Sequence, residues 1–118
     1  MTAMIVDDSP YESGQLRSIL TRLGVTVLGE YEDGISALAA IRARKPDWVT
    51  LDMQLPGMHG LEIARLLKGS KTRVIMCSGT KQKAIQEQAT AAGAVTFVVK
   101  PYDEILITAQ LRSLFDDG

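Results

Sequence analysis

The chain has 118 residues, of which 46% are apolar and 23% charged, and its 13 basic and 14 acidic residues give a net charge of −1. This is the length of one domain, and the balanced charge argues against both a nucleic-acid-binding surface and a disordered acidic tail. The single cysteine, Cys77, excludes an intramolecular disulfide, and the single histidine, His59, excludes a metal site made of two histidines.

The sequence contains no segment typical of export or membrane insertion. No apolar run approaches the roughly 20 residues that cross a bilayer. The short run Ala3–Val6 near the N-terminus is followed by acids, unlike a signal peptide. We therefore expect one cytoplasmic domain over residues 1–118, which binds neither membrane nor nucleic acid directly and is either a stand-alone protein or a piece of a longer one.

Five short apolar runs predict five β-strands. Most are continuous rather than alternating and are rich in valine, isoleucine and leucine, which is typical of strands buried on both faces of a parallel sheet. In chain order, the predicted strands are Ala3–Val6, Val25–Leu28, Trp48–Leu51, Val74–Cys77 and Val95–Val99.

A helical repeat of apolar residues follows each predicted strand. Apolar side chains recur at intervals of three and four residues, so that they form one stripe along a helix. The five stripes are Leu16, Ile19, Leu20 and Leu23; Ile35, Leu38 and Ile41; Leu61, Ala64 and Leu67; Ile85, Ala89 and Ala92; and Ile107, Leu111, Leu114 and Phe115.

Capping residues mark the ends of these helices. Ser9, Pro10 and Glu12 predict a capping box, in which the serine and glutamate side chains each accept a backbone N–H of the first helical turn. Pro46 ends the second helix. Glycines that suit the left-handed position after a helix follow three of the repeats: Gly24, Gly69 and Gly93.

The alternation of strand and helix predicts an α/β fold, a flavodoxin-like doubly wound sheet. Five β–α units joined by short loops give a five-stranded parallel sheet with right-handed crossovers and helices on both faces. Five strands fit the order 2-1-3-4-5. In such sheets, ligands bind at the carboxyl ends of the strands, where the order reverses between strands 1 and 3.

Polar residues follow four of the predicted strands at that edge. Each alone has an ordinary explanation as a cap, a turn or a surface residue, and only their combination indicates a site. They are Asp7 and Asp8 after the first strand, Asp52 after the third, Ser78, Gly79 and Thr80 after the fourth, and Lys100 and Pro101 after the fifth.

Three carboxylates at one edge predict a bound cation. Asp7, Asp8 and Asp52 would repel one another when ionised, and oxygen ligands without a histidine or thiolate favour Mg²⁺. Lys100 adds a second positive charge. Together with the Ser78 hydroxyl, these groups suit a phosphoryl ligand, and one carboxylate could be the nucleophile that forms an acyl phosphate.

These residues carry a resemblance to a known family. Over nearly its whole length the chain resembles the receiver domain of two-component response regulators, in particular the stand-alone chemotaxis regulators. The matching motifs, in order and at the usual spacings, are Ile5–Ser9 (IVDDS), Leu51–Gly60 (LDMQLPGMHG), Met76–Gly79 (MCSG) and Val98–Pro101 (VVKP).

The resemblance implies roles around the metal. Asp52 matches the phosphoacceptor, Asp8 the direct Mg²⁺ ligand, and Asp7 the acid that reaches the metal mainly through water. Gln54 matches a position whose backbone carbonyl binds the metal. Gln54 and Thr80 each lie two residues past a site residue, and we expect them to tune the rate of dephosphorylation.

The resemblance also implies phosphate-binding and switch residues. Ser78, Gly79 and Lys100 match the phosphate-binding positions. Ser78 and Phe97 match the hydroxyl and the aromatic ring of the switch. The bond between Lys100 and Pro101 matches a cis peptide bond, which an X-Pro sequence permits.

A receiver domain implies a phosphorylation-dependent signalling switch. A histidine kinase or a histidine phosphotransfer protein would donate a phosphoryl group to Asp52 with Mg²⁺ present. The target protein would bind the face made by the fourth helix, the fifth strand and the fifth helix. We expect no enzymatic activity beyond the domain's own phosphorylation and slow autodephosphorylation.

Three alternatives stay open on the sequence. A receiver fold could act as a binding module without phosphorylation, although the complete set of acidic, hydroxyl and lysine residues argues against it. An aspartyl-phosphate phosphatase of the haloacid dehalogenase type needs a second aspartate two residues after the nucleophile, where this chain has Gln54. A flavodoxin-type FMN protein needs a phosphate-binding loop after the first strand, where Asp7 and Asp8 would repel a phosphate.

Overall fold

The computed structural model describes residues 1–117, and Gly118, the last residue of the expected domain, lies outside them. Within residues 1–117, five strands alternate with five helices. The strands are β1 (Thr2–Val6), β2 (Thr26–Tyr31), β3 (Trp48–Asp52), β4 (Arg73–Ser78) and β5 (Ala94–Val99), and the helices are α1 (Pro10–Arg22), α2 (Gly34–Arg44), α3 (Gly60–Leu67), α4 (Lys83–Ala91) and α5 (Glu104–Asp117).

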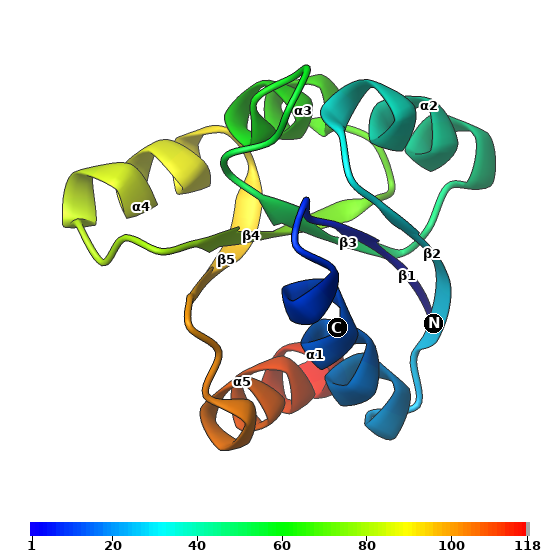
Figure 1. The fold of residues 1–118 in the computed structure, drawn as a ribbon, viewed down its shortest axis with the longest axis vertical. Helices are drawn as coiled ribbons and strands as arrows, with labels where there is room; N and C mark the ends of the chain where they lie inside the picture. The colour runs from blue at the N-terminus through cyan, green and yellow to red at the C-terminus, as the bar shows by residue number, and fades with distance from the viewer. Residues whose placement is uncertain (118) are drawn as a thin grey trace.

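The strands form one parallel sheet in the order β2-β1-β3-β4-β5. Helices α1 and α5 cover one face of the sheet, and α2, α3 and α4 cover the other (Figure 1). None of the helices within residues 1–117 combines the length and the apolar character needed to span a bilayer. The predicted flavodoxin-like doubly wound fold is confirmed.

Each face of the sheet has its own apolar core. Successive strand residues point to opposite faces, so each buried strand contributes side chains to both cores. The core under α2, α3 and α4 includes Met4, Val6, Leu51 and Met76, and the core under α1 and α5 includes Ala3, Ile5, Trp48, Ile75 and Val98.

Strand β2 is longer than its apolar run predicted. The run ends at Leu28, but the strand continues through Gly29 and Glu30 to Tyr31. Because β2 lies at the edge of the sheet and pairs only with β1, a polar residue can remain exposed within it. Glu30 is exposed and forms an ion pair with Arg17 of α1.

The predicted stripe on α2 is wrong at Ile35, which is 62% exposed. Ile35 lies outside the buried face of the helix, and its side chain covers Gly57 in the loop after β3. The residues that do face the core follow the intervals of three and four that an α-helix requires. They are Gly34, Ala37, Leu38 and Ile41.

The predicted helix ends are confirmed. Gly24, Gly69 and Gly93 have φ angles of 83°, 87° and 105°, and each directly follows the C-cap residue of α1, α3 or α4. Helix α2 ends at Arg44, shortly before Pro46. The loops between the elements are therefore placed as the capping residues indicate.

Gly60 lets helix α3 begin directly on the backbone that follows β3. A β-carbon at Gly60 would lie 2.3 Å from the carbonyl oxygen of Asp52 and 2.8 Å from the Cα of Met53. The Gly60 N–H donates to the Met53 carbonyl at 2.9 Å. This close approach fixes the backbone at Asp52, the last residue of the strand.

A pair of glycine substitutions tests this packing. Gly60→Ala should lower the free energy of unfolding by about 1–3 kcal/mol, because the methyl group displaces backbone rather than a flexible side chain. Gly14→Ala is the matched control, since Gly14 is exposed within α1 and a methyl group there would meet no side chain or neighbouring segment within 4 Å. It should raise the free energy of unfolding by about 0.5–1 kcal/mol. Urea denaturation measures both, and a Gly60→Ala protein as stable as the wild type would contradict the close approach.

Candidate functional site

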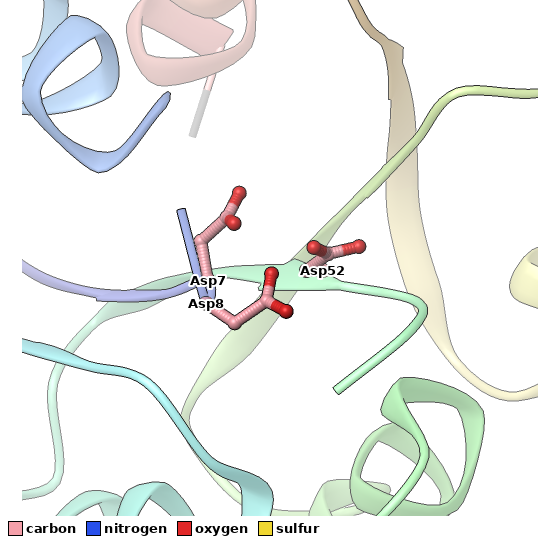
Figure 2. Close-up of side chains that lie close together, drawn as sticks. All are labelled: Asp7, Asp8 and Asp52. Atoms are coloured by element: carbon pink, nitrogen blue, oxygen red, sulfur yellow. The ribbon is translucent and has the colours of Figure 1, made fainter. Parts of the chain in front are cut away.

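The carboxyl ends of β1 and β3 bring three aspartates together. These strands are neighbours, with Val6 opposite Leu51, so Asp7 and Asp8 lie beside Asp52. One carboxylate oxygen of each aspartate lies within 4.8 Å of the others. Figure 2 shows the cluster, with Asp7 and Asp8 directed to different sides. The predicted gathering of three carboxylates is confirmed.

Asp7 and Asp8 have different surroundings. Asp7 is 2% exposed, and both its oxygens accept hydrogen bonds, Oδ1 from the Ser9 N–H and Oδ2 from Lys100 Nζ, each at 2.9 Å. Asp8 is exposed, and within residues 1–117 no hydrogen bond to its carboxylate is found. Asp8 is therefore the acid of the pair that is open to a direct ligand.

Asp52 is a buried carboxylate, 7% exposed at the end of β3. Its Oδ1 accepts the Gln54 N–H at 3.2 Å, and its Oδ2 accepts a hydrogen bond from Lys100 Nζ at 2.9 Å. Burial raises the pKa of Asp52, the ion pair with Lys100 opposes that rise, and the charge of Asp7 adds to it. The negative charge of Asp52 thus depends on Lys100 for compensation.

Lys100 is the common partner of carboxylates from three parts of the chain. Its Nζ donates to Asp7 Oδ2 at 2.9 Å, to Asp52 Oδ2 at 2.9 Å and to Glu12 Oε1 at 3.1 Å. Burial by itself lowers the pKa of Lys100, but the hydrogen bonds with Asp7 and Asp52 raise it above its ordinary value. All three ammonium protons are engaged, and the lysine stays charged.

Glu12 is the site residue that sequence reasoning missed, and the predicted capping box is wrong in its second half. Ser9 caps α1, its Oγ accepting the Glu12 N–H at 3.3 Å. The Ser9 N–H, which a capping-box glutamate would bind, is taken by Asp7. The Glu12 side chain reaches Lys100 instead. The only sequence signal was an acid one helical turn past the aspartate pair.

The loop after β4 forms the opposite wall of the site. Ser78 Oγ accepts the Thr80 N–H at 3.3 Å, and Thr80 Oγ1 accepts the Gln82 N–H at 3.1 Å. The Ser78 hydroxyl acts as an acceptor in this turn, so its proton can be donated elsewhere. The Lys100 N–H donates to the Ser78 carbonyl at 2.8 Å, which joins the ends of β4 and β5.

A pocket of about 670 Å³ opens between these walls. Every predicted metal or phosphate-binding residue lines it except Asp7, whose carboxylate is buried against Lys100. The peptide bond between Lys100 and Pro101 is cis, as the resemblance implied. The lining residues among those predicted for the site are Asp8, Asp52, Gln54, Ser78, Gly79, Thr80 and Lys100.

Phe97, the predicted switch aromatic, is not among the residues that line the pocket. It is half-buried on β5 opposite Met76 and packs against the core under α2, α3 and α4. Its carbonyl accepts a hydrogen bond from Gln110 of α5 at 3.2 Å. Phe97 lies two residues before Val99, the residue that pairs with Ser78. A link between Ser78 and Phe97 would therefore run along two paired strands.

The donor set fits Mg²⁺. Asp7, Asp8 and Asp52 offer carboxylate oxygens, which a hard divalent cation prefers. Cys77 pairs with Asp52 across β3 and β4, but burial raises the pKa of its thiol to about 12. The thiol therefore stays protonated at neutral pH and adds no soft ligand to the oxygen set.

Comparisons with known proteins agree with this geometry. The family model of the response regulator receiver domain matches residues 3–112. The chemotaxis protein CheY of Thermotoga maritima is 34% identical over 113 residues, which cover 94% of each chain. The chemotaxis protein CheY of Bacillus subtilis is 35% identical over 101 residues, which cover 84% of each chain.

Solved structures of receiver domains superpose closely on the chain. The CheX-CheY-BeF3-Mg complex from Borrelia burgdorferi gives a TM-score of 0.89 with 31% identity, covering 98% of this chain and 89% of that one. The signal receiver domain of NarL from Mycobacterium tuberculosis gives 0.85 with 32% identity, covering 96% and 94%. The chain belongs to the receiver domain family of response regulators, which works in phosphorylation-based signalling.

Proposed function

We propose that this domain is a cytoplasmic switch that accepts a phosphoryl group on Asp52. The observation that carries the proposal is the position of Asp52, which is paired with Lys100 at 2.9 Å and lines the pocket beside Ser78 and Gly79. The phosphoryl group would come from a phosphohistidine of a histidine kinase or a phosphotransfer protein, with Mg²⁺ as cofactor. Receiver domains in general bind Mg²⁺ and interact with histidine kinases and effector proteins.

In the proposed transfer, a carboxylate oxygen of Asp52 attacks the phosphorus of the phosphohistidine. An O–P bond forms, the N–P bond breaks, and its electron pair stays on the histidine nitrogen of the donor. Mg²⁺, when bound, would supply positive charge to the phosphoryl oxygens. Asp8 would hold it directly, together with Asp52, the carbonyl of Gln54 and, mainly through water, Asp7.

Lys100 and Ser78 would bind the transferred group. The Lys100 ammonium already donates to Asp52, and on transfer that donor would turn to a phosphoryl oxygen. The Ser78 proton is available for a second oxygen, and Gly79 leaves the same wall of the pocket open. Such charge-assisted hydrogen bonds from donors that are already held in place stabilise the negative charge of the phosphoryl group during transfer.

The domain would catalyse only its own phosphorylation and slow autodephosphorylation. Gln54 and Thr80 line the same pocket as Asp52, through which attacking water would enter, and would set the rate of hydrolysis. Rapid turnover of a separate phosphate ester would need an acid where Gln54 stands.

The output would pass to the face made by α4, β5 and α5. Moving Ser78 toward a phosphoryl group would draw the loop after β4 inward, and the ring of Phe97 would fill the space beside β5. This face carries exposed apolar side chains, with Val95 47%, Leu106 67% and Ile105 83% exposed. Exposed apolar groups on one face suit a protein target.

Substitution of the phosphoacceptor is the first test. Asp52→Asn should abolish labelling by acetyl phosphate, because the amide is not a nucleophile that can form the acyl phosphate. Intact-protein mass spectrometry at fixed times measures the labelled fraction. Asp116→Asn, a change at an exposed aspartate of α5, is the matched control and should label like the wild type.

The metal is tested in the same assay. A chelator should stop the labelling of the wild type. Asp8→Ala should raise the Mg²⁺ concentration needed for half-maximal labelling by about tenfold or more, which is the order of the affinity lost when a metal site loses one ligand interaction. Undiminished labelling of Asp52→Asn at another residue would overturn the phosphoacceptor, and an unchanged Mg²⁺ dependence of Asp8→Ala would overturn the metal role.

The output face is tested by amide chemical shifts. Adding beryllofluoride and Mg²⁺ should shift the amide resonances of residues 52–60 and 78–84 at the site, and also those of residues 95–106 on β5 and the start of α5. A ligand changes such an equilibrium only through its different affinity for the two states. Ser78→Ala should keep the first set of changes and reduce the last. Changes confined to the site loops in the wild type would rule out this output.

A further inference from the structure

Glu12 is a fourth carboxylate at the site, and the transfer described above gives it no role. Its Oε1 accepts a hydrogen bond from Lys100 Nζ at 3.1 Å, the longest of the three lysine contacts. The Glu12 side chain is 24% exposed, whereas those of Asp7 and Asp52 are 1% and 9% exposed. Glu12 is therefore the most accessible of the groups that hold Lys100.

An anion attached to Asp52 can accept a hydrogen bond from Lys100 only if the ammonium gives up one of its three present hydrogen bonds. Asp7 keeps its hydrogen bond from the Lys100 ammonium, because the Asp7 carboxylate is buried and its other oxygen accepts the Ser9 N–H at 2.9 Å. The anion can gain the donor that Asp52 releases, but the contact with Glu12 limits how far the ammonium can move toward it. The charge of Glu12, one ammonium group away from Asp52, also repels an anion there and attracts a divalent cation.

We propose that Glu12 is a positioning residue that holds Lys100 back from the phosphoryl group and so weakens anion binding at Asp52. The inference rests on the proposed function, since the anion in question is the phosphoryl group on Asp52. It predicts different effects on the affinities of two ligands. Removing the charge of Glu12 tightens binding of a phosphoryl mimic and leaves Mg²⁺ binding unchanged or weaker.

The test compares Glu12→Gln with the wild-type chain. Glutamine has nearly the same shape, suits the same position in the first helical turn, and keeps an oxygen that Lys100 can reach. Beryllofluoride is titrated at saturating Mg²⁺ and followed by amide NMR, and Mg²⁺ alone is titrated by calorimetry. The beryllofluoride dissociation constant should fall roughly threefold to tenfold, the range for one partly screened charge at this separation.

Glu62→Gln is the matched control. Glu62 also lies in the first turn of a helix, α3, and is exposed, and within the described chain it forms no ion pair with Lys100. This variant loses the same charge and should change the beryllofluoride constant less than twofold. The Lys100 side-chain nitrogen resonance, followed by ¹⁵N NMR, should shift in Glu12→Gln and not in Glu62→Gln.

The outcomes separate the inference from the proposed function. Tighter beryllofluoride with equal or weaker Mg²⁺ binding in Glu12→Gln alone supports the inference. Weaker binding of both ligands would mean that Glu12 only supports the start of α1. An unchanged beryllofluoride dissociation constant in Glu12→Gln, or equal tightening in Glu62→Gln, would mean that the Lys100 contact has no effect. Each of these results overturns the inference and leaves the proposed function standing. A wild-type chain that does not bind beryllofluoride with Mg²⁺ overturns the proposed function together with it.

Discussion

One ammonium group compensates a cluster of three carboxylates, two of them buried, and the site depends on that interaction. Lys100 donates to Asp7, Asp52 and Glu12 at 2.9, 2.9 and 3.1 Å. Burying a carboxylate without a partner is costly, so the buried Asp7 and Asp52 can share this edge of the sheet with the more exposed Glu12 only because the lysine lies between them. The charges still do not balance when Asp8 is included. The excess negative charge favours a divalent cation, and in the proposed function the shared lysine would supply a donor for the phosphoryl group.

The parallel sheet decides which side chains can take part. Asp7 follows Ile5 in the alternation along β1, and Lys100 follows Val98 on β5, so both point to the face covered by α1 and α5. Glu12, in the first turn of α1, lies on that face. Asp8 takes the opposite direction and lines the pocket. The two adjacent aspartates therefore differ in exposure and in partners, so that one fixes the lysine and the other is left open to a ligand.

Much of this could be predicted from the sequence, because continuous apolar runs and the crossover rule determine which strand ends meet. The aspartate cluster, Lys100 and the pocket wall at Ser78 follow from that topology. The exceptions depend on tertiary context. The length of β2 depends on its edge position, the exposure of Ile35 on how α2 is rotated over the sheet, and the contact of Glu12 on Asp7 taking the Ser9 N–H first. A local sequence pattern does not contain these three effects, because each depends on residues that are brought together only by the fold.

The most direct measurement of the central claim is the free energy of unfolding of Lys100→Met, compared with the wild type without divalent cations and again with Mg²⁺. If the ammonium compensates the carboxylates, the variant should lose about 3–5 kcal/mol without Mg²⁺, as expected when one partner of a buried ion pair is removed. Mg²⁺ should then stabilise the variant more than it stabilises the wild type, because the metal takes over part of the same neutralisation. A variant as stable as the wild type without Mg²⁺, with the same response to the metal, would contradict the account.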